Sequence, residues 1–244
     1  MKKLLLILCS TAALVIPAIG ASTVLAPAAN AATPVTVSAG LKWTPTPGGN
    51  TWFGLLPNWC TMTAVGTDDL GNKIGITAGH CVANQNPGAK IHEYKNNLPA
   101  FLNPAIGELV YKDTTAEKDY AIIKFYNDRV VLDSTTPGGL EVTHVAQAVV
   151  GQHVQKDGAT TGVDGGDVKA VNGFDVRTTY FEASGGDSGA PLITDDGGVV
   201  ARLRGPEQST PISPATGLIW RGLPDAIAEI PAGAPGHGFV HVNN

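Results

Sequence analysis

The feature of the sequence that most constrains the fold is a series of short apolar runs that begins just after Cys60. Each run ends at a cluster of Gly, Asp, Asn or Pro, and no long amphipathic helical pattern interrupts the series. Short runs that end at turn residues are typical of β-strands. The sequence therefore predicts an all-β fold. We expect strands at 61–65, 74–78, 107–111, 120–125, 141–150, 179–182, 191–194, 198–203 and 216–220, with helical turns at 81–84 and 224–230.

A natural break divides the predicted strands into two halves at 135–139, which reads Thr-Thr-Pro-Gly-Gly. Many short strands at regular spacing indicate either a β-sandwich or β-barrels, and two packed barrels fit the length of 244 residues. The 43% hydrophobic residues and 30 glycines supply ample core material and turns. We expect the first barrel at 51–134 and the second at 135–223, followed by a short helix and tail at 224–244. The Thr-, Pro- and Gly-rich segment 32–50 lacks sustained periodicity, which indicates an N-terminal arm or short pro-region.

Residues 1–31 have the pattern of a secretory signal peptide. A short basic start precedes an almost wholly apolar segment at 4–19, and Ala29 and Ala31 form a small-x-small cleavage signal. A membrane anchor is the alternative, but the apolar segment is shorter than the ~20 residues that a spanning helix needs. We therefore expect a secreted, extracellular protein with no membrane association after cleavage.

Cleavage at that position removes Cys9 and leaves two cysteines, Cys60 and Cys81. An even pair in an exported protein suggests a disulfide. The bond would close a loop of about 20 residues, which the chain-entropy model values at about 3 kcal/mol. Two free structural thiols are the alternative.

The charge balance argues against a nucleic-acid partner. The formal net charge is −5, the isoelectric point is near 5.6, and the chain contains no run of Lys or Arg. Nucleic-acid binding needs a basic surface that neutralises phosphates. We expect no nucleic-acid partner.

Ser188 lies in a glycine-rich turn, Gly-Gly-Asp-Ser-Gly at 185–189, immediately before the apolar run at 191–194. Nucleophilic catalysis needs such a turn, because glycines let backbone N–H groups converge beside the hydroxyl. The N–H groups of Gly186 and Ser188 are therefore candidates for stabilising an oxyanion. An ordinary Gly/Ser loop is the alternative.

His80 and Asp119 are the candidate partners of the serine. His80 follows one apolar run and adjoins Cys81, so a disulfide there would restrict where the imidazole lies. Asp119 precedes another apolar run, where its carboxylate would hold the imidazole tautomer and stabilise the imidazolium. Asp113 and Asp128 are the nearest competitors, but each lies in a polar turn. The sequence thus predicts a Ser–His–Asp constellation.

Together these segments resemble the three motifs of the chymotrypsin-like (S1) serine peptidases. The motifs are Thr-Ala-Gly-His-Cys at 77–81, Asp-Tyr-Ala at 119–121, and Gly-Asp-Ser-Gly at 186–189 with Pro191. Their order, His then Asp then Ser, also matches. Gly-Ala-Thr-Thr-Gly at 158–162 resembles a segment of the bacterial streptogrisin and α-lytic branch.

The resemblance implies two packed antiparallel six-stranded β-barrels of the trypsin-like fold, with the active site in the cleft between them. It implies a serine-type endopeptidase that hydrolyses protein or peptide substrates without a metal or organic cofactor, and we expect a monomer. Ser188 would be the nucleophile, His80 the general base and then acid, and Asp119 the residue that orients His80. Gly186 and Ser188 would form the oxyanion hole. Asp187 and Lys156 would form a buried structural ion pair.

The region expected to bind substrate departs from the family pattern. The resemblance places the substrate pocket at Glu182, Leu203, Arg204 and Gly205. Glu182 hints at a basic side chain in the substrate, but Arg204 could neutralise it. Two arginines, Arg202 and Arg204, stand where the family has its substrate-binding strand.

Two other functions compete with the peptidase. An α/β-hydrolase carries Gly-x-Ser-x-Gly followed by a helix, with the acid and histidine downstream. Here Ala190 replaces the second glycine, a predicted strand follows Ser188, and His80 lies upstream, and all three features argue against that class. The remaining alternative is a catalytically silent, protease-like binding or adhesion module. The presence of all three triad candidates argues against it.

Overall fold

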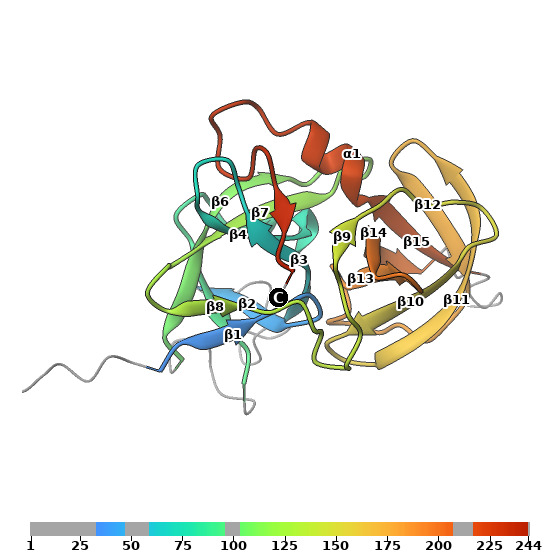
Figure 1. Ribbon diagram of the computed structural model, residues 1–244, viewed down its shortest axis with the longest axis horizontal. Coiled ribbons are helices and arrows are strands. Elements are labelled where there is room, and N and C mark those ends of the chain that lie inside the picture. Colours follow the sequence, from blue (N-terminus) through green and yellow to red (C-terminus); the bar gives the residue numbers. More distant parts are fainter. Residues whose placement is uncertain (1–32, 47–58, 96–102, 207–216, 244) are drawn as a thin grey trace, which may run out of the picture. The chain divides into compact units, whose positions relative to one another are not determined.

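The computed structural model describes residues 33–46, 59–95, 103–206 and 217–243 (Figure 1). The predicted signal peptide at 1–31 lies outside the described residues. Within those ranges, no helix is both long and apolar enough to cross a membrane.

The first barrel is a closed antiparallel sheet in the order β3-β2-β5-β6-β7-β4, and pairing between β3 and β4 closes it. The short strand β16 (Val240–His241) pairs in antiparallel with the last residues of β3, where Val240 lies opposite Thr67. The six barrel strands are β2 (Lys42–Thr46), β3 (Cys60–Thr67), β4 (Lys73–Ala78), β5 (Lys90–Glu93), β6 (Ala105–Asp113) and β7 (Tyr120–Phe125).

The second barrel is closed in the same way, in the order β13-β10-β11-β12-β15-β14, with β13 paired to β14. The two-residue strand β9 (His144–Val145) runs parallel to β14 beside it. The prediction of two six-stranded antiparallel barrels is confirmed (Figure 1). The six strands are β10 (His153–Gly158), β11 (Gly162–Asn172), β12 (Asp175–Thr179), β13 (Pro191–Thr194), β14 (Gly198–Pro206) and β15 (Gly217–Gly222).

The segment 32–50 is more than the predicted arm. Strand β1 (Val35–Val37) pairs in parallel with β8 (Val130–Leu132), and β2 belongs to the first barrel itself. The sequence of β2 contains Pro45, and because proline is rare inside sheets, the sequence predicts a loop there. Its Trp43 is completely buried and supplies the tertiary contacts that hold the strand in place.

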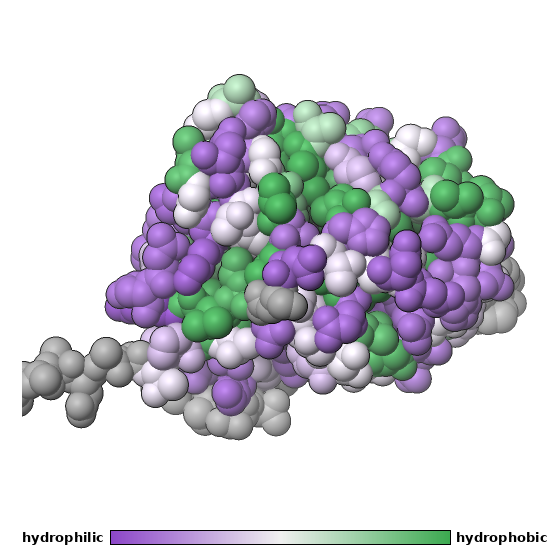
Figure 2. Space-filling model, in the orientation of Figure 1, coloured by the Kyte–Doolittle hydropathy of each residue, from purple (hydrophilic) through white to green (hydrophobic). Residues whose placement is uncertain are grey.

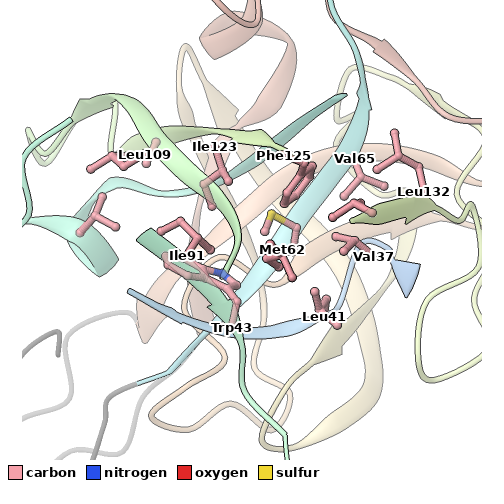
Figure 3. Packing of buried hydrophobic residues seen from close by; sticks show 14 residues of the cluster. Val37, Leu41, Trp43, Met62, Val65, Ile91, Leu109, Ile123, Phe125 and Leu132 are labelled. Atoms are coloured by element: carbon pink, nitrogen blue, oxygen red, sulfur yellow. The ribbon is translucent and has the colours of Figure 1, made fainter. Parts of the chain in front are cut away.

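Each barrel encloses its own apolar core. In the first barrel, Trp43, Met62 and Phe125 pack with aliphatic residues from several strands (Figure 3). In the second, Trp220 and Leu192 belong to the corresponding cluster. The outer surface in Figure 2 mixes hydrophilic and apolar residues.

A third apolar cluster joins the two barrels. It contains residues of β4 and β7, residues of β13 and β14, and the buried face of α1 (Leu223–Ala228). This cluster fixes one barrel against the other, so residues on β7 and β14 can meet in a defined geometry.

Docking of β16 is expected to weaken in acid because of His241. The Nδ1 atom of His241 lies 2.5 Å from the Val242 carbonyl oxygen, while its buried Nε2 has no hydrogen-bond partner. Burial lowers the pKa of His241 below its ordinary value of 6.5. The neutral ring is therefore favoured in the folded state, and its contribution to stability is present above pH 6.5 and lost as the pH falls towards the lowered pKa.

Hydrogen exchange measures this effect. The Val242 amide donates to the Val65 carbonyl, so its protection reports docking of the strand. We expect that protection to fall several-fold between about pH 8 and about pH 5, and to become independent of pH in His241→Phe. A matched change of the exposed His153 to Gln should leave the response intact. Equal responses in the wild type and His241→Phe would contradict the assignment.

Candidate active site

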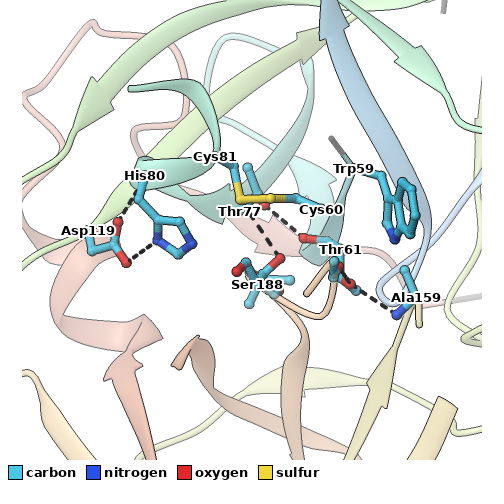
Figure 4. The surroundings of a disulfide bond; sticks show 12 residues. Trp59, Cys60, Thr61, Thr77, His80, Cys81, Asp119, Ala159 and Ser188 are labelled. Carbon is cyan, nitrogen blue, oxygen red and sulfur yellow. Dashed lines mark hydrogen bonds and ion pairs between the residues drawn. A yellow bond between two sulfur atoms is a disulfide. The ribbon is translucent and has the colours of Figure 1, made fainter. Parts of the chain in front are cut away.

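His80 and Asp119 meet at the edge of the first barrel (Figure 4). His80 lies in the 3-10 helix η2 (Gly79–Val82) directly after β4, and Asp119 directly precedes β7, which pairs with β4. The imidazole Nδ1 lies 2.8 Å from Asp119 Oδ2, and the His80 backbone N–H donates to Asp119 Oδ1 at 2.7 Å. The carboxylate side chain is 3% exposed and the imidazole 39%. A buried carboxylate therefore bonds to the Nδ1 edge of an imidazole that is itself partly exposed to solvent.

The backbone at Asp119 has an unusual conformation. Its φ of 48° makes it the only residue other than glycine with positive φ in the described ranges. Asp tolerates this left-handed region better than most residues, but the region is still sparsely populated. Something must hold the turn in place.

Arg202 supplies that support from β14 of the second barrel. Its side chain is completely buried, and Nε donates to the Asp119 carbonyl at 2.8 Å. Its Nη2 donates to the Lys118 carbonyl, and Nη1 donates to the Gly222 carbonyl at 3.0 Å. Burial lowers the pKa of Arg202 to about 10, so the guanidinium stays protonated at neutral pH. From the sequence, Arg202 is expected only as part of the substrate-binding strand, although a charge inside an apolar run itself indicates a buried polar network.

Replacement of Arg202 by Met is expected to reduce the free energy of unfolding by about 3 kcal/mol. The change leaves the carbonyls of Asp119, Lys118 and Gly222 buried without their donor. Urea unfolding followed by circular dichroism measures the loss. Arg129→Met, at an exposed position, is the matched control and should change stability little. A comparable loss in both variants would show that Arg202 has no special structural role.

Ser188 sits in a turn that both barrels hold. The Gly189 N–H donates to the Leu203 carbonyl of β14 at 2.8 Å, and the Thr61 N–H of β3 donates to the Ser188 carbonyl at 2.8 Å. Gly186 has φ of 101°, and a Cβ added there would lie 2.1 Å from Trp59 Nε1. Glycine is therefore required at 186. This explains why the motif places glycine two residues before the serine.

The turn leaves two backbone donors unused. Among the described residues, no acceptor receives a hydrogen bond from the N–H of Gly186 or of Ser188. These are the two groups that the sequence predicts as an oxyanion hole. Unpaired N–H groups beside a serine hydroxyl are suited to binding a negatively charged oxygen.

Three of the predicted site residues line one cavity, which has a volume of about 410 Å³. His80, Ser188 and Gly186 line it, with Trp59 and the Cys60–Cys81 disulfide. Figure 4 shows the imidazole between Asp119 and Ser188. In the described part of the chain no hydrogen bond joins His80 to Ser188, and such bonds commonly tighten only when substrate binds.

The Cys60–Cys81 disulfide forms as the cysteine pattern suggests, with a Cα–Cα distance of 6.3 Å. It ties the residue after His80 to the first residue of β3, and the next residue, Thr61, bonds to the turn that contains Ser188. The cross-link thereby connects the imidazole segment to the segment that holds Ser188.

Asp187 and Lys156, which the resemblance predicts as a buried ion pair, share a hydrogen-bond partner in the structure. Both side chains are completely buried, but no nitrogen–oxygen contact within 4.0 Å joins them. The Thr161 hydroxyl lies between, 2.7 Å from Lys156 Nζ and 2.7 Å from Asp187 Oδ2. Asp187 also accepts from the backbone N–H groups of Thr160 and Ser184. Asp187 is thus bonded to neutral donors, and its charge acts on Lys156 across Thr161, where it opposes the lowering of the Lys156 pKa by burial.

The four residues predicted to line the substrate pocket differ in their surroundings. Glu182 is exposed, and no ion pair joins it to Arg204, although both are described. The Leu203 side chain is 2% exposed and packs in the barrel core, so it offers no pocket surface. A Cβ at Gly205 would meet open space. Arg204 alone lines a cavity beside His80, one of about 220 Å³ that also includes Asp119.

No group of three or more His, Cys, Asp or Glu side chains in the described ranges is arranged to hold a metal ion.

Comparison with known proteins identifies the architecture. A family model described as a trypsin-like peptidase domain matches residues 63–201, more than half of the chain. A glutamic acid specific serine protease is similar in structure, with 22% identity, a TM-score of 0.63, and coverage of 84% of this chain and 100% of that one. Protease A of Thermobifida fusca gives 18% identity, a TM-score of 0.60, and coverage of 80% and 95%. The α-lytic protease homolog N4 gives 24% identity, a TM-score of 0.60, and coverage of 80% of this chain and 96% of that one. At these identities the likeness of the solved structures shows a shared fold.

Proposed function

We propose that this chain, which belongs to the trypsin-like peptidase family, is a secreted serine endopeptidase with Ser188, His80 and Asp119 as its catalytic triad. One observation carries the proposal: a single cavity holds an imidazole bonded to a buried carboxylate, a serine, and two unpaired backbone N–H groups. Each of these is a part that acyl transfer requires.

The first half of the reaction forms an acyl-enzyme. His80 Nε2 takes the proton from Ser188 Oγ as the oxygen attacks the substrate carbonyl carbon. The negative charge that develops on the carbonyl oxygen is stabilised by the N–H groups of Gly186 and Ser188. His80 then gives its proton to the leaving amine, and the peptide C–N bond breaks.

The second half restores the enzyme. Water replaces the amine, His80 accepts a proton from it, and the resulting hydroxide attacks the acyl carbon. The ester bond to Ser188 breaks, and the proton returns to Ser188 Oγ. Throughout, Asp119 keeps Nδ1 protonated and stabilises the imidazolium, since its Oδ2 is already 2.8 Å from that atom.

The proposal is tested by reacting the purified, secreted protein with a fluorophosphonate probe and mapping the labelled peptide. We expect labelling at Ser188 and none in Ser188→Ala. Ser184→Ala, in the same loop, is a matched control that should still be labelled. An unlabelled but folded, disulfide-bonded wild type would instead support the silent binding module. Sequencing of the secreted protein's N-terminus tests the predicted cleavage after Ala31.

A further inference from the structure

Arg204 occupies a β-bulge at the end of β14. Where β14 pairs with β15, Leu203 lies opposite Trp220 and Gly205 lies opposite Ile219, so Arg204 is the extra residue. Such bulges commonly redirect a side chain and recur beside active sites. The neighbouring Arg202 is buried in the interface described above, whereas Arg204 is half-buried and lines a cavity.

That cavity adjoins the catalytic one. It has a volume of about 220 Å³, and its lining consists of Arg204, Thr114, Thr115, Asp119 and His80. His80 also lines the larger cavity that contains Ser188. A peptide whose scissile bond lies at Ser188 therefore places a neighbouring residue within reach of Arg204.

Two of the donor side chains in this cavity, Arg204 and Thr114, have no hydrogen-bond acceptor among the described residues. Within the described ranges, no hydrogen bond or ion pair engages the Arg204 guanidinium or the Thr114 hydroxyl. Thr115 differs, because its N–H and hydroxyl both donate to Asp113 Oδ1. A guanidinium and a hydroxyl that both lack protein acceptors can bind a carboxylate together.

Among the described residues, no acidic side chain forms an ion pair with Arg204. Asp119 Oδ1 and Oδ2 accept from the His80 N–H and Nδ1, and the Asp119 backbone carbonyl accepts from the buried Arg202. Asp113 is held by Thr115, and Glu182 forms no ion pair with Arg204. The positive charge of Arg204 therefore faces the cavity.

We propose that Arg204 is a specificity-determining residue that binds a substrate carboxylate within a few residues of the scissile bond. The inference rests on the proposed peptidase function. It reverses the preference for a basic side chain that Glu182 suggests from the sequence. The carboxylate belongs either to an acidic side chain or to a free C-terminus close to the cleaved bond.

Internally quenched peptides that differ at one position by Glu or Gln test the proposal, each with a free or amidated C-terminus. In one of these pairs, we expect the wild type to cleave the carboxylate-bearing peptide with a kcat/KM about 10- to 100-fold higher than that of its uncharged counterpart. Arg204→Gln should remove the preference, and Arg204→Glu should favour Lys at the same position. Arg129→Gln loses the same charge at an exposed site and should retain the wild-type preference.

Two further measurements separate this inference from the peptidase proposal. Fluorophosphonate labelling of Ser188 at similar rates in the wild type and the Arg204 variants shows that each is folded and has a competent nucleophile. Peptide binding to Ser188→Ala by titration calorimetry reports the Glu-over-Gln preference without turnover. A preference that survives in Arg204→Gln, or that is absent from the wild type in both assays, overturns the role of Arg204. If Ser188 is not labelled but the Glu-over-Gln preference in binding remains, only the peptidase proposal is overturned.

Discussion

Replacement of Ser188 by alanine is expected to lower kcat by about 10⁶-fold, and replacement of His80 by alanine by a similar factor. The two side chains act as one unit, because the serine oxygen becomes nucleophilic only as the imidazole removes its proton. The double variant should therefore be no slower than either single variant. Hydrolysis of a quenched peptide measures all three.

The control for this prediction lies in the same loop. Ser184 is exposed, and its printed bonds to Asp187 are both made by its backbone: its N–H donates to Asp187 Oδ2, and its carbonyl accepts from the Asp187 N–H. Ser184→Ala keeps both groups and should keep wild-type activity. Some hydrolysis above the rate in water should persist in the Ser188→Ala protein, because the N–H groups of Gly186 and Ser188 remain. Losses that multiply in the double variant would contradict a shared proton transfer.

Replacement of Asp119 by asparagine is expected to lower kcat by about 10⁴-fold. The amide can still accept from the His80 backbone N–H, and Asn tolerates the positive φ at this position. However, an amide N–H placed beside Nδ1 favours the wrong imidazole tautomer. The variant should therefore fold normally and yet lack a base at Nε2.

Steady-state kinetics and urea unfolding together check this prediction. We expect the free energy of unfolding of Asp119→Asn to change far less than its kcat implies. Asp113→Asn is the matched control, since that carboxylate bonds to Thr115 in a polar turn and touches neither His80 nor Ser188. If both variants lose activity equally, the carboxylate of Asp119 does not orient the base.

The strands that the sequence analysis found are those with buried, apolar runs. β4, β7 and β13 are almost wholly buried and were predicted nearly to their ends. β11 was missed because most of its side chains are exposed or half-buried and it contains Gly, Asp and Lys. Pairing with β10 and β12 holds it in the barrel. The long run 141–150 contains only the two-residue strand β9, and its Val149 and Val150 are exposed.

The sequence by itself determined the barrel architecture, the pair of cysteines that is cross-linked, and the residues proposed as the triad. Each depends on local information: an apolar run, a turn motif, or a residue beside a strand end. Only the tertiary structure decided what surrounds those residues. Arg202 reaches Asp119 across 83 positions, and Thr161 separates Lys156 from Asp187. The bulge that directs Arg204 depends on the register of β14 against β15. Contacts between distant segments depend on how the two barrels pack and on the register in which their strands pair. A local sequence pattern in one segment does not specify which distant residue will contact it.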